Sequence, residues 1–520
     1  MPQNTATARP FRSTLVPLTT FALGTHMLCE MSQAQLSFTL QEYYPTISDV
    51  TSVRIAPLSD DALADVAVLQ EYGLLSYLEN VGQGRLQKVG LWTGVGDDPL
   101  GLISFDVNNN ALFDLVWTEG NGRVQTLYQR RRLSDSYALS ASVPSYSADT
   151  IKVDVDRDGA EDVAVLRTRR LSGGYGGLHI LQNRQGVLTP VSSLVLTRNY
   201  CPSFAPGDFD QDGDMDLLTV EADVYQSYYN EYKVNDSQIA IYLNDGRGVF
   251  SPGPTTSLYL GRNGSLLVER VAAGDTDNDG DIDAVISLRQ TEEGAPSHVL
   301  AMEYRGLDSP FEISQQLYPS TNARVVELFD LDLDGDLDLL LSGHVESHGD
   351  IAVYTNNGHG TFEWSLDVST GVGGANCIDI GDVNADGLPD LLIGGRYGFA
   401  VAVNTMNWLG PYLESDPLIP GEEVTFQITE APPGGTAELY YSLAGYRPSA
   451  GMVRLGGMVV ELAEPAIRIG RAVIGERGSA EWASRIPEDA KSVPVYLQAY
   501  ARLGQRIVKT PCILTRVRRK

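Results

Sequence analysis

The sequence is poor in the residues and motifs that most enzyme active sites need. Its 520 residues include 4 cysteines and 6 histidines, and it contains no Gly-x-Ser-x-Gly, Walker-type or His-Glu-x-x-His motif. No apolar run is long enough to cross a membrane as a helix. The nearest approach to a catalytic metal cluster is the pair His344 and His348. On a strand or loop this i, i+4 spacing does not bring two ligands to one metal, so we do not expect a zinc site there.

Basic residues are also in deficit. The chain has 38 Lys and Arg against 67 Asp and Glu, for a formal net charge of −29. This balance argues against nucleic acid as a partner, because nucleic acid selects basic patches. Much of the negative charge is local, since it is concentrated in short acidic loops that recur along the chain.

The acidic loops are copies of one nine-residue motif. The clearest copy spans Asp208 to Asp216, and four others begin at Asp154, Asp275, Asp330 and Asp382. Side-chain oxygens occupy positions 1, 3, 5 and 9, and a glycine at position 6 permits the sharp turn that folds them around one ion. Calcium prefers six to eight oxygen ligands, and no Cys or His lies in any of these loops, so soft metals are disfavoured.

We therefore predict about five calcium sites, with position 7 contributing its backbone carbonyl. The predicted ligands are Asp154, Asp156, Asp158, Ala160 and Asp162; Asp208, Asp210, Asp212, Asp214 and Asp216; Asp275, Asp277, Asp279, Asp281 and Asp283; Asp330, Asp332, Asp334, Asp336 and Asp338; and Asp382, Asn384, Asp386, Leu388 and Asp390. Asp and Gly also mark ordinary turns, but five copies with one ligand spacing favour the metal.

Two further copies have lost part of the motif. One keeps four oxygens but only two charges, and it predicts a weak sixth site at Asp106, Asn108, Asn110 and Asp114. The other has Pro57 at position 1, so we expect no calcium there. Position 9 of each strong copy leads into an apolar strand rather than into the helix of an EF-hand.

The seven motif starts lie about 50 residues apart, a period typical of propeller blades. Each interval contains apolar strands and, in several cases, an Asn-Asp-Gly or Asn-Asn-Gly hairpin signal, as at 244–246 and 356–358. We predict an all-β fold with almost no helix: a seven-bladed β-propeller over 35–412. Prolines then mark a boundary, and short strand-like runs predict a small C-terminal β-sandwich over 413–520.

The repeated Asp-x-Asp-x-Asp-Gly-x-x-Asp motif resembles that of the FG-GAP/VCBS repeat family, whose best-known members form the seven-bladed head of integrin α subunits. The resemblance covers about residues 50–404, although the Phe-Gly and Gly-Ala-Pro signatures of the family are not present as a pair. It implies that the acidic loops join the first two strands of each blade and bind calcium on one face. It also implies that a partner docks on the other face.

Antiparallel strands support the same division, because successive connections in a blade alternate between faces. The acidic loops and the Asn-Asp-Gly turns share one face, and the linkers between second and third strands lie on the opposite face. The linker around Tyr225, Tyr228, Tyr229 and Tyr232 is unusually rich in tyrosine. It predicts either a contact surface or an extended hairpin whose tyrosines cover the edge of the blade.

The N-terminal residues indicate the cellular compartment of the protein. Residues 1–34 resemble a secretory signal, with Arg9 and Arg12 before a moderately apolar stretch. We therefore expect a secreted, extracellular or periplasmic protein, where calcium reaches the millimolar range. Disulfide pairing among Cys201, Cys377 and Cys512 cannot be assigned from the sequence.

Two classes of function remain. The first is a secreted binding or adhesion module in which calcium is structural and an unidentified protein or glycan docks on the face opposite the calcium loops. The second is a secreted polysaccharide hydrolase or lyase on a calcium-stabilised propeller. We favour binding, because the linkers are mostly short and the basic residues that a lyase needs are scattered.

Overall fold

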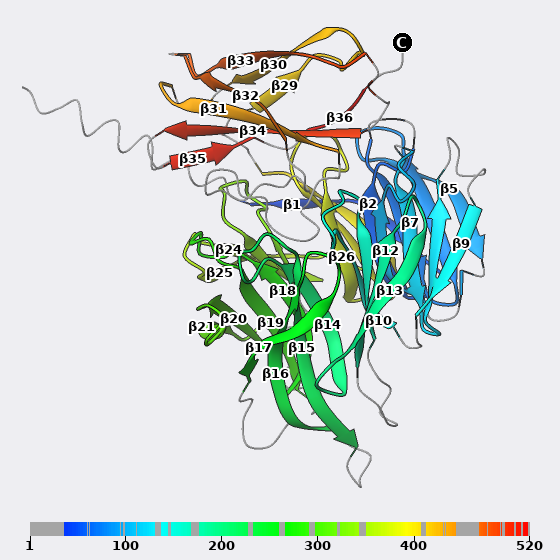
Figure 1. Cartoon of the computed structure of the whole chain (residues 1–520). Helices are drawn as coiled ribbons and strands as arrows, with labels where there is room; N and C mark the ends of the chain where they lie inside the picture. Colours follow the sequence, from blue (N-terminus) through cyan, green and yellow to red (C-terminus); the bar gives the residue numbers. More distant parts are fainter. Residues whose placement is uncertain are drawn as a thin grey trace, which may run out of the picture.

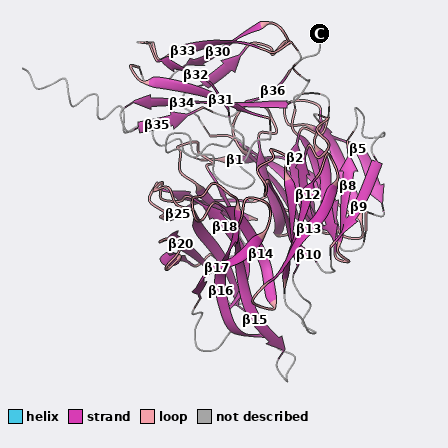
Figure 2. Ribbon diagram, viewed as in Figure 1, coloured by secondary structure: helices cyan, strands magenta, loops and turns pink. Residues whose placement is uncertain are grey.

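The computed structural model contains only strands and their connections within the part of the chain that it describes (Figure 2). It describes residues 36–517 except 60, 62, 94, 97–98, 111, 130–136, 144–146, 168–175, 227–231, 259–265, 291–296, 320–322, 343–349, 407–411, 430, 432, 444–466, 476, 489, 491–493, 504–505 and 511–512. The predicted signal segment, the pair His344 and His348, and Cys512 lie outside these residues. Among the described residues, no helix is long and apolar enough to cross a membrane.

Seven four-stranded antiparallel sheets form the larger part of the protein, which confirms the predicted seven-bladed propeller (Figure 1). In chain order, blades one to seven comprise β2 (Val50–Ala56), β3 (Asp65–Gln70), β4 (Leu74–Asn80), β5 (Leu86–Thr93); β6 (Pro99–Phe105), β7 (Asp114–Glu119), β8 (Arg123–Tyr128), β9 (Tyr137–Ser142); β10 (Ser147–Val153), β11 (Asp162–Arg167), β12 (Gly177–Asn183), β13 (Leu188–Val195); β14 (Tyr200–Gly207), β15 (Asp216–Gln226), β16 (Tyr232–Asn244), β17 (Phe250–Ser257); β18 (Leu266–Gly274), β19 (Asp283–Gln290), β20 (His298–Tyr304), β21 (Phe311–Leu317); β22 (Val325–Phe329), β23 (Asp338–Ser342), β24 (Ile351–Asn356), β25 (Phe362–Val368); and β26 (Ala375–Gly381), β27 (Asp390–Gly395), β28 (Gly398–Asn404) with β1 (Phe38–Pro45).

The second strand of each blade is apolar because both of its faces are covered. In β3, β7, β23 and β27 every residue is buried, and these strands are packed between the neighbouring blades. The fourth strands β5, β13 and β25 are instead mostly exposed or half-buried, with a buried residue at the start of each, as expected for strands at the outer edge of a blade. The apolar runs that follow each acidic motif therefore lie inside the ring.

The seventh blade is completed by the N-terminal strand. β1 pairs antiparallel with β28, from Phe38 opposite Asn404 to Pro45 opposite Gly398. The backbone N–H of Thr405 also donates to the carbonyl of Ser37 at 2.7 Å. The ring is thus closed by two segments that lie at opposite ends of the propeller sequence.

The C-terminal residues form two further sheets around one apolar core, as expected for a small β-sandwich. One sheet contains β29 (Tyr412–Ser415), β30 (Glu423–Thr429) and β33 (Ala480–Arg485). The other contains β31 (Thr436–Ser442), β32 (Ile467–Val473), β34 (Pro494–Leu503), β35 (Arg506–Lys509) and β36 (Ile513–Arg516). Phe426, Leu439, Trp482 and Leu497 from both sheets are buried in the core between them.

The two parts are stacked on each other, with the C-terminal sheets above one end of the propeller (Figure 1). The chain leaves the propeller after β28, which ends next to the acidic loops, and β29 begins a few residues later. The long β15–β16 hairpin extends from the opposite end of the propeller (Figure 1). The C-terminal sheets therefore lie on the acidic-loop side.

Candidate metal centre

All seven acidic loops are closed by the same backbone pair. The last residue of the first strand pairs with the aspartate at position 9, as in Val153 with Asp162 and Gly207 with Asp216, and also in the two decayed copies, Ala56 with Asp65 and Phe105 with Asp114. The loops thus join the first two strands of each blade, as predicted.

Two residues of each strong loop have a left-handed backbone. The glycines at position 6, which the sequence indicated, have φ of 83° at Gly159 and 88° at Gly213. The residues at position 4 also have positive φ although none is glycine: Arg157, Gln211, Asn278, Leu333 and Ala385, with φ between 57° and 62°. Non-glycine side chains adopt this conformation at a cost, so the rest of the loop must hold them there.

Hydrogen bonds within the loop fix the first and fifth ligand positions. The carboxylate at position 1 accepts from the backbone N–H of the glycine at position 6, as in Gly159 to Asp154 at 3.0 Å and Gly213 to Asp208 at 3.0 Å. The carboxylate at position 5 accepts from the N–H of position 7, as in Ala160 to Asp158 at 2.8 Å. Each carboxylate is therefore oriented by the backbone before any ion binds.

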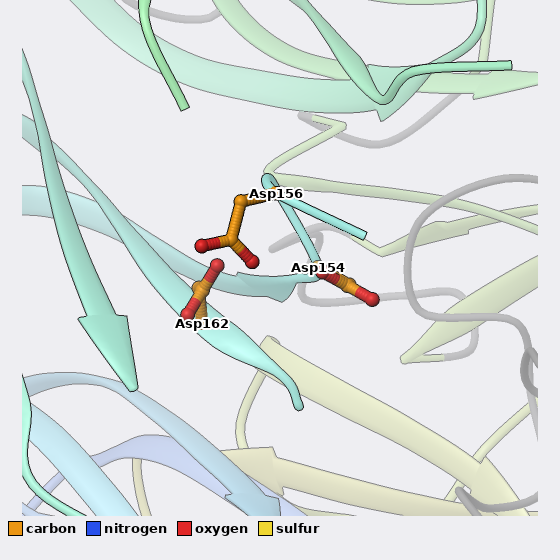
Figure 3. A group of neighbouring side chains, drawn as sticks. All are labelled: Asp154, Asp156 and Asp162. Carbon is orange, nitrogen blue, oxygen red and sulfur yellow. The ribbon is translucent and has the colours of Figure 1, made fainter. Parts of the chain in front are cut away.

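Four groups of three carboxylates have oxygens within 4.8 Å of one another among the described residues. They are Asp154, Asp156 and Asp162; Asp208, Asp210 and Asp216; Asp275, Asp277 and Asp279; and Asp330, Asp332 and Asp338. Figure 3 shows the first group, with the carboxylates of Asp156 and Asp162 facing each other and Asp154 beside them.

The oxygens in these groups suit a hard cation. Asp154 and Asp208 each use Oδ2 to accept the glycine N–H, while Oδ1 is buried and accepts no hydrogen bond from the described residues. Asp156 likewise accepts from Gln182 through Oδ2, and its Oδ1 has no hydrogen-bond partner within the part of the chain that the structure describes. A buried carboxylate oxygen without a donor is costly unless a cation binds it, so these residues fit calcium.

The electrostatics of the loops favour the same conclusion. Burial raises the pKa of Asp162 and of Asp216 to about 7. Burial together with the neighbouring Asp330 and Asp332 raises the pKa of Asp334 to about 9. Carboxyl groups held close together away from water resist ionisation, and a divalent cation at the centre offsets that penalty.

The remaining predicted ligands are not all brought into these groups. Asp158, Asp212 and Asp334 at position 5 and Asp283 at position 9 lie outside the groups of their own loops. In the seventh blade Asp382, Asp386 and Asp390 form no such group among the described residues, although Gly387 donates to Asp382 at 2.8 Å as in the other loops. The fifth site, the weak sixth site and the carbonyl ligands at position 7 stay predictions.

The aspartate at position 9 has a second role that the sequence pattern does not indicate. Asp216 accepts from the N–H of Phe209 at 3.0 Å and from the N–H of Asn244 at 2.8 Å, so it joins its own loop to the end of the third strand. The equivalent bonds are present in the decayed second copy, where Asp114 accepts from Val107 and Gln129. In the first copy, where Pro57 replaces the ligand at position 1, Asp65 still accepts from the N–H of Asn80 at 2.8 Å, so this aspartate has a structural role that does not depend on the metal.

The asparagine at the end of the third strand links neighbouring blades. Asn244 Nδ2 donates to the carbonyl of Val155 in the preceding blade at 2.9 Å. Four other blades have the same contact: Asn80 with Val383, Asn183 with Val107, Asn356 with Thr276 and Asn404 with Leu331. In the fifth blade, the hydroxyl of Tyr304 donates to Phe209 instead. From the sequence, Asn244 and Asn356 were expected only as residues of hairpin turns.

The position-4 side chain of one loop also reaches position 7 of the next. Arg157 Nε lies 2.5 Å from Asp214 Oδ1, and its Nη2 donates to the carbonyl of Asp212 at 2.9 Å. Gln211 donates to Asp281 at 2.5 Å, and Asn278 donates to Asp336 at 2.7 Å. These contacts, here called the loop chain, run through the loops of blades three to six.

Two sequence signals could have revealed the loop chain. In three consecutive pairs of neighbouring loops, the residue at position 4 of one loop is polar and the residue at position 7 of the next loop is acidic. In the next pair, Leu333 and Leu388 are both apolar and belong to one buried cluster. Alignment of the seven repeats would have exposed this complementarity.

The other candidate features are placed as follows. The tyrosine-rich linker forms an extended hairpin of β15 and β16, in which the side chain of Tyr225 is 51% exposed, whereas Tyr228 and Tyr229 lie outside the described residues. Among the described residues, Cys201 and Cys377 form no disulfide bond.

Comparison with known proteins identifies the repeats. Residues 154–219 and 330–393 match the FG-GAP-like repeat. Each match begins at the first residue of an acidic loop and ends within the second strand of the following blade. The resemblance predicted from the acidic motif is confirmed there. No curated protein sequence matches the chain. One similar solved structure is the crystal structure of BBS1N in complex with ARL6DN, soaked with lead, at 14% identity and a TM-score of 0.45, covering 71% of this chain and 97% of that chain.

Proposed function

We propose that this propeller with FG-GAP-like repeats is a secreted binding module, in which calcium stabilises the loops on one face and the opposite face binds a protein or glycan. The acidic loops supply the first part of this proposal. Their carboxylates are oriented by backbone N–H groups and are saturated by an ion when calcium is bound, which makes them poor general bases. Calcium is therefore structural, and extracellular calcium concentrations suit such sites.

The observation that carries the proposal is a group of large exposed side chains on the face opposite the acidic loops. On the acidic-loop side, Tyr496 of β34 and Leu514 of β36 line the end of the central channel. On the opposite side, Ile47, Tyr72 and Tyr397 are 87%, 82% and 57% exposed. We call these three residues the tyrosine patch.

The residues of the tyrosine patch are held together by backbone contacts across blades seven and one. Thr46 N–H donates to the carbonyl of Tyr397 at 3.2 Å, and Glu71 N–H donates to the carbonyl of Asp49 at 2.9 Å. The segment that carries Ile47 is therefore bonded to the turns that carry both tyrosines. Tyr43 strengthens the arrangement, because its hydroxyl donates to the carbonyl of Tyr397 at 2.7 Å.

Such a patch has the chemistry of a recognition surface. Tyrosine combines a large apolar ring with a polar hydroxyl, which suits the centre of a protein interface and the apolar face of a sugar. Large exposed apolar residues are rarely clustered on the surface of a protein without a binding role.

Screening of the calcium-loaded protein on a glycan array and against immobilised extracellular proteins tests the proposal. We expect at least one specific ligand, and we expect the double substitution Tyr72→Ser with Tyr397→Ser to weaken its binding at least tenfold. Trp364→Ser is the matched control, because Trp364 is an equally exposed aromatic residue (59%) on the outer strand β25. A ligand bound equally well by the double variant, or lost in the control, would refute the assignment of the face.

A further inference from the structure

The loop chain joins acidic loops that belong to different blades, and Arg157 makes the most contacts within it. Arg157 stands at position 4 of the loop of blade three, and its guanidinium reaches the loop of blade four. Nε donates to the carbonyl of Gly213 at 3.0 Å, and Nη2 donates to the carbonyl of Asp212 at 2.9 Å. Nε also lies 2.5 Å from Oδ1 of Asp214. One side chain of blade three thus contacts positions 5, 6 and 7 of the next loop.

These contacts hold the part of the loop that carries two predicted calcium ligands, the side chain of Asp212 and the backbone carbonyl of Asp214. The side chain of Asp214 is only 9% exposed, and it is enclosed between Arg157 and the turn after β16. A Cβ atom at Gly246 in that turn would lie 2.6 Å from Oδ2 of Asp214. A Cβ atom at Gly213 would lie 2.8 Å from Nη2 of Arg157, so this glycine also permits the close approach of the guanidinium.

The position of Arg157 depends in turn on its own loop. It lies between the predicted ligands Asp156 and Asp158, and its φ of 57° is in the left-handed region. A non-glycine residue adopts this conformation at a cost. An ion bound by Asp156 and Asp158 fixes the backbone on both sides of Arg157 and offsets that cost. Calcium in blade three therefore stabilises the conformation that directs Arg157 toward blade four.

The same relation repeats in the next two blades. Gln211, with φ of 60°, donates to Asp281 at 2.5 Å, and Asn278, with φ of 62°, donates to Asp336 at 2.7 Å. A Cβ atom at Gly358 would lie 2.6 Å from Oδ2 of Asp336, so this carboxylate is packed against a turn as Asp214 is. Each of these loops thus contacts the next through its position-4 side chain.

The loop chain ends where position 7 has no side-chain acceptor. Position 7 is Ala160 in blade three and Leu388 in blade seven. Leu388 instead belongs to a buried apolar cluster that also contains Leu333, the position-4 residue of blade six. Polar side chains therefore connect the loops of blades three to six, and the loop of blade seven lies outside this connection.

We propose that calcium binding by the loops of blades three to six is positively cooperative. An ion in one loop fixes the residue at position 4, whose side chain then holds the next loop close to its calcium-bound form. The second ion consequently binds at a smaller cost in conformational entropy. The coupling is reciprocal, because linkage requires each site to affect the other equally. It rests on the calcium sites of the proposed function, and it fills these four loops over a narrow range of calcium concentration.

Hydrogen–deuterium exchange of the full-length protein, measured by mass spectrometry in buffers of fixed free calcium concentration, reports on each loop separately. The backbone N–H groups of Gly213 and Asp214 donate to the carboxylates of Asp208 and Asp212, so their exchange slows when the loop is ordered. The calcium concentration at half-maximal protection of residues 208–216 therefore measures binding in blade four. Residues 382–390 give the same measurement for blade seven.

Asp156→Asn removes one ligand charge from the loop of blade three. We expect this substitution to raise the half-maximal calcium concentration for residues 208–216 at least about fivefold and to leave that for residues 382–390 unchanged. Asp386→Asn is the matched control, because it makes the same change in a loop outside the loop chain. It should leave the half-maximal concentration for residues 208–216 unchanged.

Arg157→Met tests whether this side chain carries the coupling. In the Arg157→Met protein, residues 208–216 should no longer respond to Asp156→Asn. Arg247→Met should preserve the response, because it removes an exposed arginine from the turn next to the same loop without altering the loop chain. Thermal melting at saturating calcium confirms that each variant is folded.

The outcomes separate the coupling from the calcium sites themselves. Calcium-dependent protection of residues 208–216 that does not respond to Asp156→Asn, or that responds equally with and without Arg157, would overturn the coupling and leave the calcium sites intact. Protection that does not depend on calcium in any loop of the unsubstituted protein would overturn the calcium sites and the coupling together.

Discussion

The asparagine that joins neighbouring blades offers the sharpest test of how the ring is held together. Asn244 is 6% exposed, and its side chain makes three hydrogen bonds. Nδ2 donates to the carbonyls of Val155 at 2.9 Å and Met215 at 3.1 Å, and Oδ1 accepts from the N–H of Gly248 at 3.1 Å. Replacement by alanine removes all three and leaves buried backbone groups without partners.

The expected cost follows from these contacts. A buried polar group that loses its partner costs about 1–3 kcal/mol, and the losses at Val155 and Gly248 are separate. We expect Asn244→Ala to lower the free energy of unfolding by about 3 kcal/mol. Asn244→Asp keeps the shape but places an acceptor against the carbonyl of Val155, so it should cost at least as much.

Urea unfolding of the calcium-loaded protein, followed by circular dichroism, measures the effect as a shift of the midpoint at unchanged slope. The matched control is Asp245→Ala in the same turn, because among the described residues the side chain of Asp245 accepts only from the N–H groups of Arg247 and Val249, in its own blade. That substitution should cost no more than about 1 kcal/mol. Equal midpoints for the two alanine variants, or a tolerated Asn244→Asp, would show that the cross-blade bond is not what stabilises this position.

Three other predictions follow from the loops and the blade interior. A chelator should lower the melting temperature of the protein, and Asp210→Asn should remove about one calcium ion per chain by mass spectrometry; an unchanged melt would refute the calcium assignment. Arg157→Met should weaken calcium binding by the loop that contains Asp214, which a calcium titration measures. Unchanged calcium affinity would show that the loop chain does not contribute to calcium binding. Burial lowers the pKa of His179 to about 4, below its ordinary value of 6.5. Stability should therefore fall as pH drops from about 6.5 to 4, and His179→Phe should reduce that pH dependence in urea melts.

The sequence predicted the local part of the structure well. The glycine at position 6, the aspartates before it and the apolar run after it all lie within one hairpin, and their physical requirements act over a few residues. Seven repeats of this short-range pattern were enough to predict the propeller. The short strands predicted after the prolines are also present, as in β30 and β31.

The contacts between blades were not predicted, because they join residues far apart in the chain. Asn244 and Val155 are separated by 89 residues, and nothing in the local sequence distinguishes this asparagine from an ordinary turn residue. The left-handed residues at position 4 were also missed, since Arg157, Gln211 and Leu333 share no side-chain property. Their common backbone conformation is imposed by the loop rather than by residue preference.

The pairing of β1 with β28 has a consequence for the order in which the protein is made. Among the propeller strands, residues 38–45 are synthesised first, but their partner strand at 398–404 is synthesised only after the other six blades. During that interval, the first strand has no sheet to join, and the nascent ring has two open edges. Closure of the ring therefore requires its oldest and newest segments to meet, and premature termination before residue 398 would leave an arc of blades without the partner of β1.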